Sequence, residues 1–181
     1  MRTFISIELP EQVKKEIFKE FKRLENSGFV VGKFVSKDNL HLTLKFLGTL
    51  TEEQVEKVKE KLSEFDFSKF EVHTGEFGFF PSEKYVRVVW IDLVSDELIK
   101  LKEEIDKSLL EIGLNHDNRE FSSHITGARI KNVKDKEKFL DFIKGLRVKK
   151  HSFPLEKVSF MKSELTRDGP VYKTLEEFNL K

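Results

Sequence analysis

Apolar positions recur along this chain at two spacings, and each spacing predicts one kind of element. Alternation of apolar and polar residues predicts strands over 3–9, 33–35, 40–47, 70–80, 86–93, 121–130, 147–153, 155–165 and 171–178. Apolar positions three and four residues apart predict helices between Pro10 and Gly28, from Thr51 through Leu62, from Ser95 to Gly113, and over 135–145. Strands and helices interleave throughout, which predicts an α+β protein.

Local signals mark several of these boundaries. Thr51, followed three residues later by Gln54, has the pattern of a capping box at a helix start. Gly28 and Gly113 stand where the first and third helices should end. The run Thr-Arg-Asp-Gly-Pro at 166–170 predicts a turn between the last two strands.

Two predicted strands carry the same short motif. Residues 41–43 read His-Leu-Thr and residues 124–126 read His-Ile-Thr. Residues two apart in a strand share a face, so each histidine lies beside a threonine hydroxyl, with the apolar residue opposite. The motifs lie nearly half the chain apart, and each strand is followed by a turn and a helix. We therefore expect a duplication: one bilobed unit over 1–181, with half-repeats centred on His41 and His124.

Composition narrows the function classes. With a formal charge of +1, the chain has no global basic field, so any anion site must be local. It has no cysteine, which excludes disulfides, cysteine-ligated zinc and thiol catalysis. The first ten residues read as a strand rather than a signal peptide or membrane span, so we expect a cytoplasmic protein without a membrane partner. Abundant Lys and Glu also fit a thermophile.

The candidate residues each have a plain structural interpretation beside the functional one. One His-X-Thr motif alone is most simply a strand with two exposed polar residues, but the matched pair favours a paired acid–base site. Thr43 and Thr126 are either β-formers on a solvent face or donors to a substrate oxyanion. Arg129 is an odd number of residues after His124, so strand alternation places its side chain on the opposite face. Only a β-bulge beside Gly127 would turn that side chain toward the histidines.

The remaining polar residues fit structural roles. We expect the other three histidines to be structural or exposed, and two aspartates to form turns: His73, His116, His151, Asp38 and Asp117. No set of ligands has metal-site spacing, and Walker-type and dinucleotide glycine patterns are absent, so we expect no metal and no cofactor. The 18 phenylalanines offer too many candidates to single out a base-stacking residue.

With both motifs placed, the sequence resembles the 2H phosphoesterase superfamily, and within it the RNA 2′,3′-cyclic phosphodiesterases, also called 2′-5′ RNA ligases. The opening strand and proline over 2–10 and the closing hairpin over 163–172 are similar to that family. So are the motif segments Asn-Leu-His-Leu-Thr-Leu-Lys-Phe-Leu-Gly at 39–48 and Arg-Glu-Phe-Ser-Ser-His-Ile-Thr-Gly-Ala-Arg at 119–129. Two positions depart from the pattern: Ser123 replaces a usual proline, and Gly127 replaces a larger apolar residue.

The resemblance implies two antiparallel sheets facing each other across a cleft, with helices outside and lobes that exchange terminal strands. It implies hydrolysis of a 2′,3′-cyclic phosphate to a 2′-phosphate, and the reverse joining of RNA ends through a 2′-5′ bond without ATP. By motif match, His41 is the proton donor and His124 the proton acceptor. We expect a monomer that acts on RNA or nucleotides with 2′,3′-cyclic ends, tRNA fragments among them.

Elementary chemistry agrees with this assignment. Hydrolysis of a cyclic phosphodiester needs a base for the water and an acid for the leaving ribose oxygen, and two histidines supply both near neutral pH. The hydroxyls of Thr43 and Thr126 and the guanidinium of Arg129 would stabilise the phosphoryl charge. Two alternatives remain open: a protein that binds RNA ends without turnover, and a structural domain in which the paired motifs are coincidence.

Overall fold

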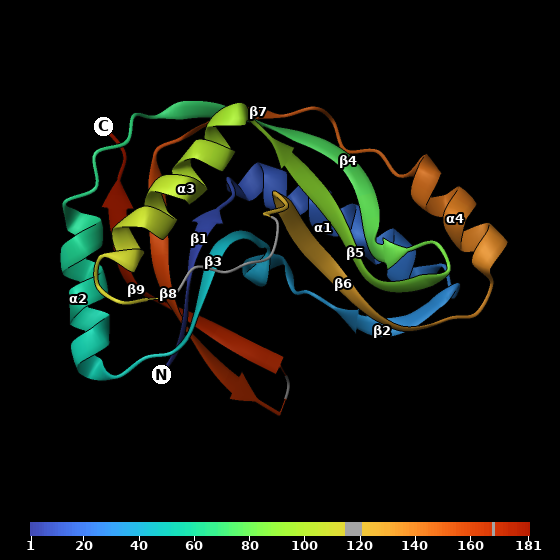
Figure 1. Ribbon diagram of the computed structural model, residues 1–181. Coiled ribbons are helices and arrows are strands. Elements are labelled where there is room, and N and C mark those ends of the chain that lie inside the picture. Colours follow the sequence, from blue (N-terminus) through green and yellow to red (C-terminus); the bar gives the residue numbers. More distant parts are fainter. Residues whose placement is uncertain (115–120, 168) are drawn as a thin grey trace.

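The computed structural model describes residues 1–114, 121–167 and 169–181, and these form a curled sheet with helices on its outer side (Figure 1). The strands are β1 Arg2–Glu8, β2 Val30–Phe34, β3 His41–Thr49, β4 Phe70–Ser82, β5 Tyr85–Val94, β6 His124–Val133, β7 Ser152–Leu155, β8 Lys157–Thr166 and β9 Gly169–Asn179. The α-helices are α1 Glu11–Asn26, α2 Glu52–Ser63, α3 Asp96–Leu110 and α4 Lys136–Gly145, with a 3₁₀ turn at Lys37–Asn39. The predicted α+β class is confirmed.

The strands pair antiparallel in the order β7-β4-β5-β6-β3-β1-β8-β9, and β2 pairs with β6. This order reads as two four-stranded halves, β6-β5-β4-β7 and β3-β1-β8-β9, which meet where β3 touches β6. The meeting point is a single registered pair, Leu42 opposite Ile125. The two sheets of the predicted fold are therefore continuous with each other through the two motif strands.

The halves are interlocked by both strands and helices. The C-terminal strands β8 and β9 lie against β1, so the half that contains the first strand is completed by the last two. Helix α1 follows β1 but packs on the other half, where the Phe21 ring meets that of Phe77 on β4, with 5.5 Å between centroids. Helix α3 follows β5 but is tied to β3 through Lys45 and Asp106.

The core also encloses an ion cluster. Its apolar part includes fully buried residues from both halves, such as Ile5, Leu42 and Ile91. Among them, the Lys45 ammonium lies 2.5 Å from an Asp106 carboxylate oxygen, and Lys102 of α3 donates to the other oxygen. Both lysines and the aspartate are almost completely buried, so the cluster is a strong link between β3 and α3.

Several predicted boundaries are confirmed and others are wrong. Thr51 and Gln54 form both hydrogen bonds of the capping box. The strand predicted over 147–153 is restricted to β7, which pairs only with residues 70–73 of β4, and the lysine-rich stretch before β7 has no partner strand among the described residues. The second motif strand begins at His124 rather than at 121. No helix in the described ranges is long and apolar enough to cross a membrane.

Candidate active site

The register between β3 and β6 brings the two motifs together. Leu42 and Ile125 are opposite each other and fully buried. Because side chains alternate, their motif neighbours leave the sheet on its other face, where all four are half-buried: His41, Thr43, His124 and Thr126. The antiparallel register sets the two histidines diagonally, and a regular ladder separates such diagonal neighbours by about 7–8 Å.

His41 is held at both ring nitrogens. Nδ1 lies 2.7 Å from the Asn39 carbonyl oxygen, which only accepts, so Nδ1 carries a proton and donates. Nε2 lies 3.0 Å from the Thr43 hydroxyl, which donates to it when the imidazole is neutral. The ring packs against Phe4 and Tyr172, each with 5.1 Å between centroids. These contacts fix the ring plane, with Nδ1 on a backbone carbonyl and Nε2 on a side-chain hydroxyl.

His124 has a closely similar arrangement in the other half. Its Nδ1 donates to the Ser122 carbonyl oxygen at 2.8 Å, again two residues before the histidine. Phe80 meets the ring edge-to-face at 5.1 Å between centroids, and Trp90 lies at 6.2 Å. Ser123, at the position of the usual proline, donates its hydroxyl to the Leu93 carbonyl at 2.7 Å and so anchors the start of β6. The same tautomer is therefore selected in both halves.

The surroundings lower the pKa of both imidazoles. For His41, burial is the main cause, partly offset by the hydrogen bond to Asn39, and the charge of Lys14 lowers the pKa further. For His124, burial is again the main cause of the lowered pKa. The hydrogen bond to Ser122 raises the pKa in part, and the charge of Arg129 lowers it further. Both rings are therefore biased toward the neutral form until an anion is bound.

A bulge turns Arg129 toward the histidine face. Val89 pairs with Ala128 and Trp90 with Thr126, so Gly127 is an extra residue on β6. The side-chain alternation shifts there: Ala128 is buried, and Arg129 is exposed on the same side as Thr126. The bulge that the functional interpretation of Arg129 requires is therefore present.

Gly127 itself allows this part of the sheet to pack on α1. A Cβ atom at this position would lie 2.0 Å from ring carbons of Phe21, far inside van der Waals contact. The missing side chain thus makes room for a buried phenylalanine of α1, which gives the departure from the family pattern a physical reason.

The first motif strand repeats this bulge and exposes a residue that sequence reasoning did not single out. Ser6 pairs with Thr43 and Ile5 with Lys45, so Leu44 is the extra residue there. Phe46 then occupies the position that Arg129 has in the second half, and it is 57% exposed. The signal was in the alignment of the two motifs, where Phe46 and Arg129 share the fifth position after the histidine.

The other sequence candidates lie outside this arrangement. His151 donates from Nε2 to the Glu16 carboxylate at 2.8 Å, and Asp38 is in the exposed 3₁₀ turn. His73 is in β4, where it is registered opposite Ser152 of β7. His116 and Asp117 fall outside the described residues. No group of three or more potential metal ligands occurs within the described ranges.

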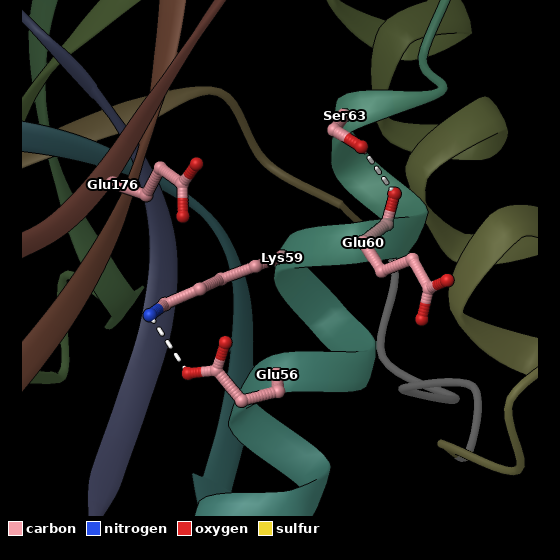
Figure 2. Close-up of a pocket in the computed structure, with 5 residues that line it drawn as sticks. All are labelled: Glu56, Lys59, Glu60, Ser63 and Glu176. Carbon is pink, nitrogen blue, oxygen red and sulfur yellow. Dashed lines mark hydrogen bonds and ion pairs between the residues drawn. The ribbon is translucent and has the colours of Figure 1, made fainter.

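A surface hollow away from the histidines has unsuitable chemistry for phosphate. It has a volume of about 360 Å³ and lies between α2 and β9 (Figure 2). Three carboxylates line it, and its one cation, Lys59, is already 2.8 Å from Glu56. Carboxylates repel an anion at close range, so the histidine face remains the candidate site.

Comparison with known proteins shows the family of this chain. The family model described as LigT like Phosphoesterase matches the chain twice, over residues 7–90 and 91–172. The RNA 2′,3′-cyclic phosphodiesterase of Methanocaldococcus jannaschii is 34% identical, with 98% of this chain and 100% of the relative covered. The RNA 2′,3′-cyclic phosphodiesterase of Thermotoga maritima is 34% identical, with 98% of this chain and 94% of the relative covered.

Solved structures agree on the fold. The protein TT0787 of Thermus thermophilus superposes with a TM-score of 0.82 at 26% identity, covering 99% of this chain and 98% of the other. E. coli LigT complexed with 3′-AMP superposes with a TM-score of 0.78 at 23% identity, covering 99% of this chain and 97% of the other. The fold and the paired motifs define a 2H phosphoesterase. Within that class, the chain belongs to the LigT-like phosphoesterase family, and its two consecutive matches bear out the duplication.

Proposed function

We propose that this protein hydrolyses the 2′,3′-cyclic phosphate at the end of RNA, or of a nucleotide, to a 2′-phosphate. The observation that carries the proposal is the matched pair of imidazoles: each donates Nδ1–H to the carbonyl two residues before it and presents Nε2 on one face of the joined sheet. The relatives named RNA 2′,3′-cyclic phosphodiesterase support the substrate class.

In this mechanism Nε2 of His124 accepts a proton from the attacking water. The new bond joins the water oxygen to phosphorus, the bond from phosphorus to the 3′ oxygen breaks, and protonated His41 gives its Nε2 proton to that oxygen. A nearby cation lowers the pKa of each ring, Arg129 for His124 and Lys14 for His41, so the assignment of base and acid rests on the motif match. Thr43, Thr126 and Arg129 hydrogen-bond the phosphoryl oxygens, on which negative charge grows.

Ligation uses the same two imidazoles, with the 5′-hydroxyl of a second RNA end in place of water. His124 accepts the proton of that hydroxyl, its oxygen bonds to phosphorus, the bond from phosphorus to the 3′ oxygen breaks, and His41 protonates the 3′ oxygen, so that a 2′-5′ bond forms without ATP. In the reverse step, in which the 3′-hydroxyl cleaves the 2′-5′ bond, the two histidines exchange roles by microscopic reversibility. We further propose that the protein acts as a monomer and that tRNA fragments are among its substrates.

The test uses a 2′,3′-cyclic nucleotide, with the two monoester products resolved by phosphorus NMR. We expect 2′-phosphate, formed equally well in the presence of EDTA. His41→Ala and His124→Ala should each reduce turnover by about 10²–10⁴-fold, and Arg129→Lys should also be damaging, because lysine lacks the planar two-pronged donor. Binding without any product would favour the alternative, a protein that only binds RNA ends, and predominant 3′-phosphate would reverse the assigned roles.

A further inference from the structure

A hollow at the tip of the β4–β5 hairpin lies apart from the histidines. It has a volume of about 210 Å³ and is lined by Glu83, Lys84, Tyr85, Val86, Arg87, Lys131, Asn132, Val133 and Lys136. It is thus built from the β4–β5 turn, the end of β6 and the start of α4, at the right of Figure 1. None of these residues has a role in the proposed reaction.

Positive charge is in excess in this hollow. Four of its residues are cationic, and Glu83 is the single carboxylate. Within the described ranges none of the four cations forms an ion pair, whereas exposed lysines elsewhere do, such as Lys57 with Glu53 at 2.7 Å. In a chain with a net charge of +1, such a local excess of positive charge is a feature that attracts an anion.

The hollow also offers a flat surface for stacking. The Arg87 guanidinium lies 4.0 Å from the centre of the Tyr85 ring, and the ring is 55% exposed. A hydrogen bond of 3.2 Å from Arg87 to the Lys131 carbonyl holds the guanidinium in place. Aromatic rings and guanidinium planes are the groups on which unpaired bases stack.

Strand β6 links the hollow to the candidate site. Ile130 is buried, so the exposed side chains of Arg129 and Lys131 on either side of it leave the strand on the same face. Lys33 of β2, also exposed, is registered opposite Arg129. From His124 to Lys131 the strand spans about 23 Å at about 3.3 Å per residue, farther than one mononucleotide reaches from a phosphate between the histidines.

We propose that this hollow binds a nucleotide of the RNA strand upstream of the cyclic-phosphate end. The base stacks on Tyr85 and Arg87, and Lys84, Lys131 and Lys136 neutralise the neighbouring phosphates. This inference rests on the proposed function and adds to it that the preferred substrate is a single-stranded oligonucleotide rather than a cyclic mononucleotide. A planar stacking pair among lysines suits bases and phosphates better than an acidic peptide.

The experiment compares 2′,3′-cyclic AMP with oligoadenylates of increasing length that end in a 2′,3′-cyclic phosphate. In the wild type, kcat/KM should rise with length until the strand reaches the hollow. Tyr85→Ala should reduce kcat/KM for the long substrate by about 5- to 150-fold, the value of one stacked base, and leave cyclic AMP unchanged. Tyr85→Phe, which keeps the ring, should behave like the wild type. Lys131→Gln should lower the slope of log Kd against log salt for the oligonucleotide product by about 0.7.

Lys15→Gln and Lys19→Gln are matched controls, because both lysines are exposed on α1 and form no ion pair with a described residue. The inference is overturned if kcat/KM does not depend on length, if the Tyr85 and Lys131 variants affect both substrates equally, or if an acidic peptide displaces the oligonucleotide's upstream portion. Failure of the proposed function is a separate result, since the wild type would then leave cyclic AMP intact.

Discussion

At the scale of single residues, the proposed chemistry depends on the proton at Nδ1 of each histidine. A backbone carbonyl accepts that proton in both halves, so the tautomer is determined by the chain itself and not by a separate carboxylate. A carbonyl adds less charge than a carboxylate would, and burial therefore dominates the pKa of each ring.

A pH prediction follows from this burial. Because burial lowers the pKa of His41 and His124, both should titrate below about 6.5 in the free protein. The alkaline limb of kcat/KM, which reports the free enzyme, should therefore also lie below about 6.5. Bound inorganic phosphate should raise both values, since an anion favours the imidazolium. Proton NMR titration of the ring protons, with and without phosphate, checks both statements.

The same shifts affect stability with a defined sign. A histidine whose folded pKa is lowered binds fewer protons in the folded than in the unfolded state. Its contribution to stability is present above the unfolded value of about 6.5 and is lost as the pH falls through the lowered folded pKa. Free-ring pKa values at or above the ordinary value for both histidines would contradict the account of the site.

At the scale of elements, the paired bulges carry information that strand alternation alone does not. Regular strand alternation would place the Arg129 side chain on the core side of the sheet. The extra residue at Gly127 moves it to the histidine side. Periodicity did place both histidines beside their threonines, and the helix starting at Thr51 was predictable because its signals are local. The buried pair of Lys45 and Asp106 was not predictable, because the two residues are 61 positions apart and join only when α3 crosses to the other half.

Substitution of Gly127 tests the packing of the bulge. Gly127→Ala forces a Cβ against the ring of Phe21, which is only 1% exposed and has nowhere to move. We expect a loss of about 1–3 kcal/mol in the free energy of unfolding, measured with urea. Gly145→Ala is the matched control, because nothing lies within 4 Å of its added Cβ.

The structure also predicts coupling between the two contacting positions. Phe21→Leu should cost less in the Gly127→Ala background than in the wild type, since the smaller side chain relieves the overlap. If the losses in the free energy of unfolding of the two substitutions are additive, the bulge and α1 are not in close steric contact.

The ion cluster gives a second prediction at this scale. Burial raises the pKa of Asp106, but hydrogen bonds from Lys102 and Lys45 more than offset it, so the net pKa is lowered. Asp106→Asn leaves buried ammonium groups without their carboxylate and should cost about 3–5 kcal/mol in urea unfolding. Asp141→Asn, on an exposed position of α4, should cost little. The cluster's contribution is present above the unfolded pKa of about 3.9 and is lost as the pH falls through the lowered folded value, so acid should narrow the gap between the Asp106 variant and the wild type.

At the scale of the whole molecule, each half is built partly from the other half's chain. Strands β8 and β9 complete the first half, α1 packs on the second and α3 on the first. The histidine face lies at the single pairing between the halves, so its geometry depends on how firmly they are held together. A duplicated chain with separate lobes would let that junction flex, whereas interlocked lobes would hold both imidazoles in one rigid frame.

We therefore predict that the two halves unfold as one unit. Trp90, the single tryptophan, reports on the second half through β5, and backbone amides of β1 report on the first. Fluorescence and far-ultraviolet circular dichroism should give the same urea midpoint, and amides of β1 and β5 should exchange hydrogen with the same opening free energy. Phe21→Ala adds a sharper test, since α1 follows the first strand in sequence but packs on the second half. It should lower the opening free energy of both amide sets equally, by about 3–5 kcal/mol. A loss confined to β4, β5 and β6 would mean that the lobes are independent and that the interlocked strands and helices do not couple them.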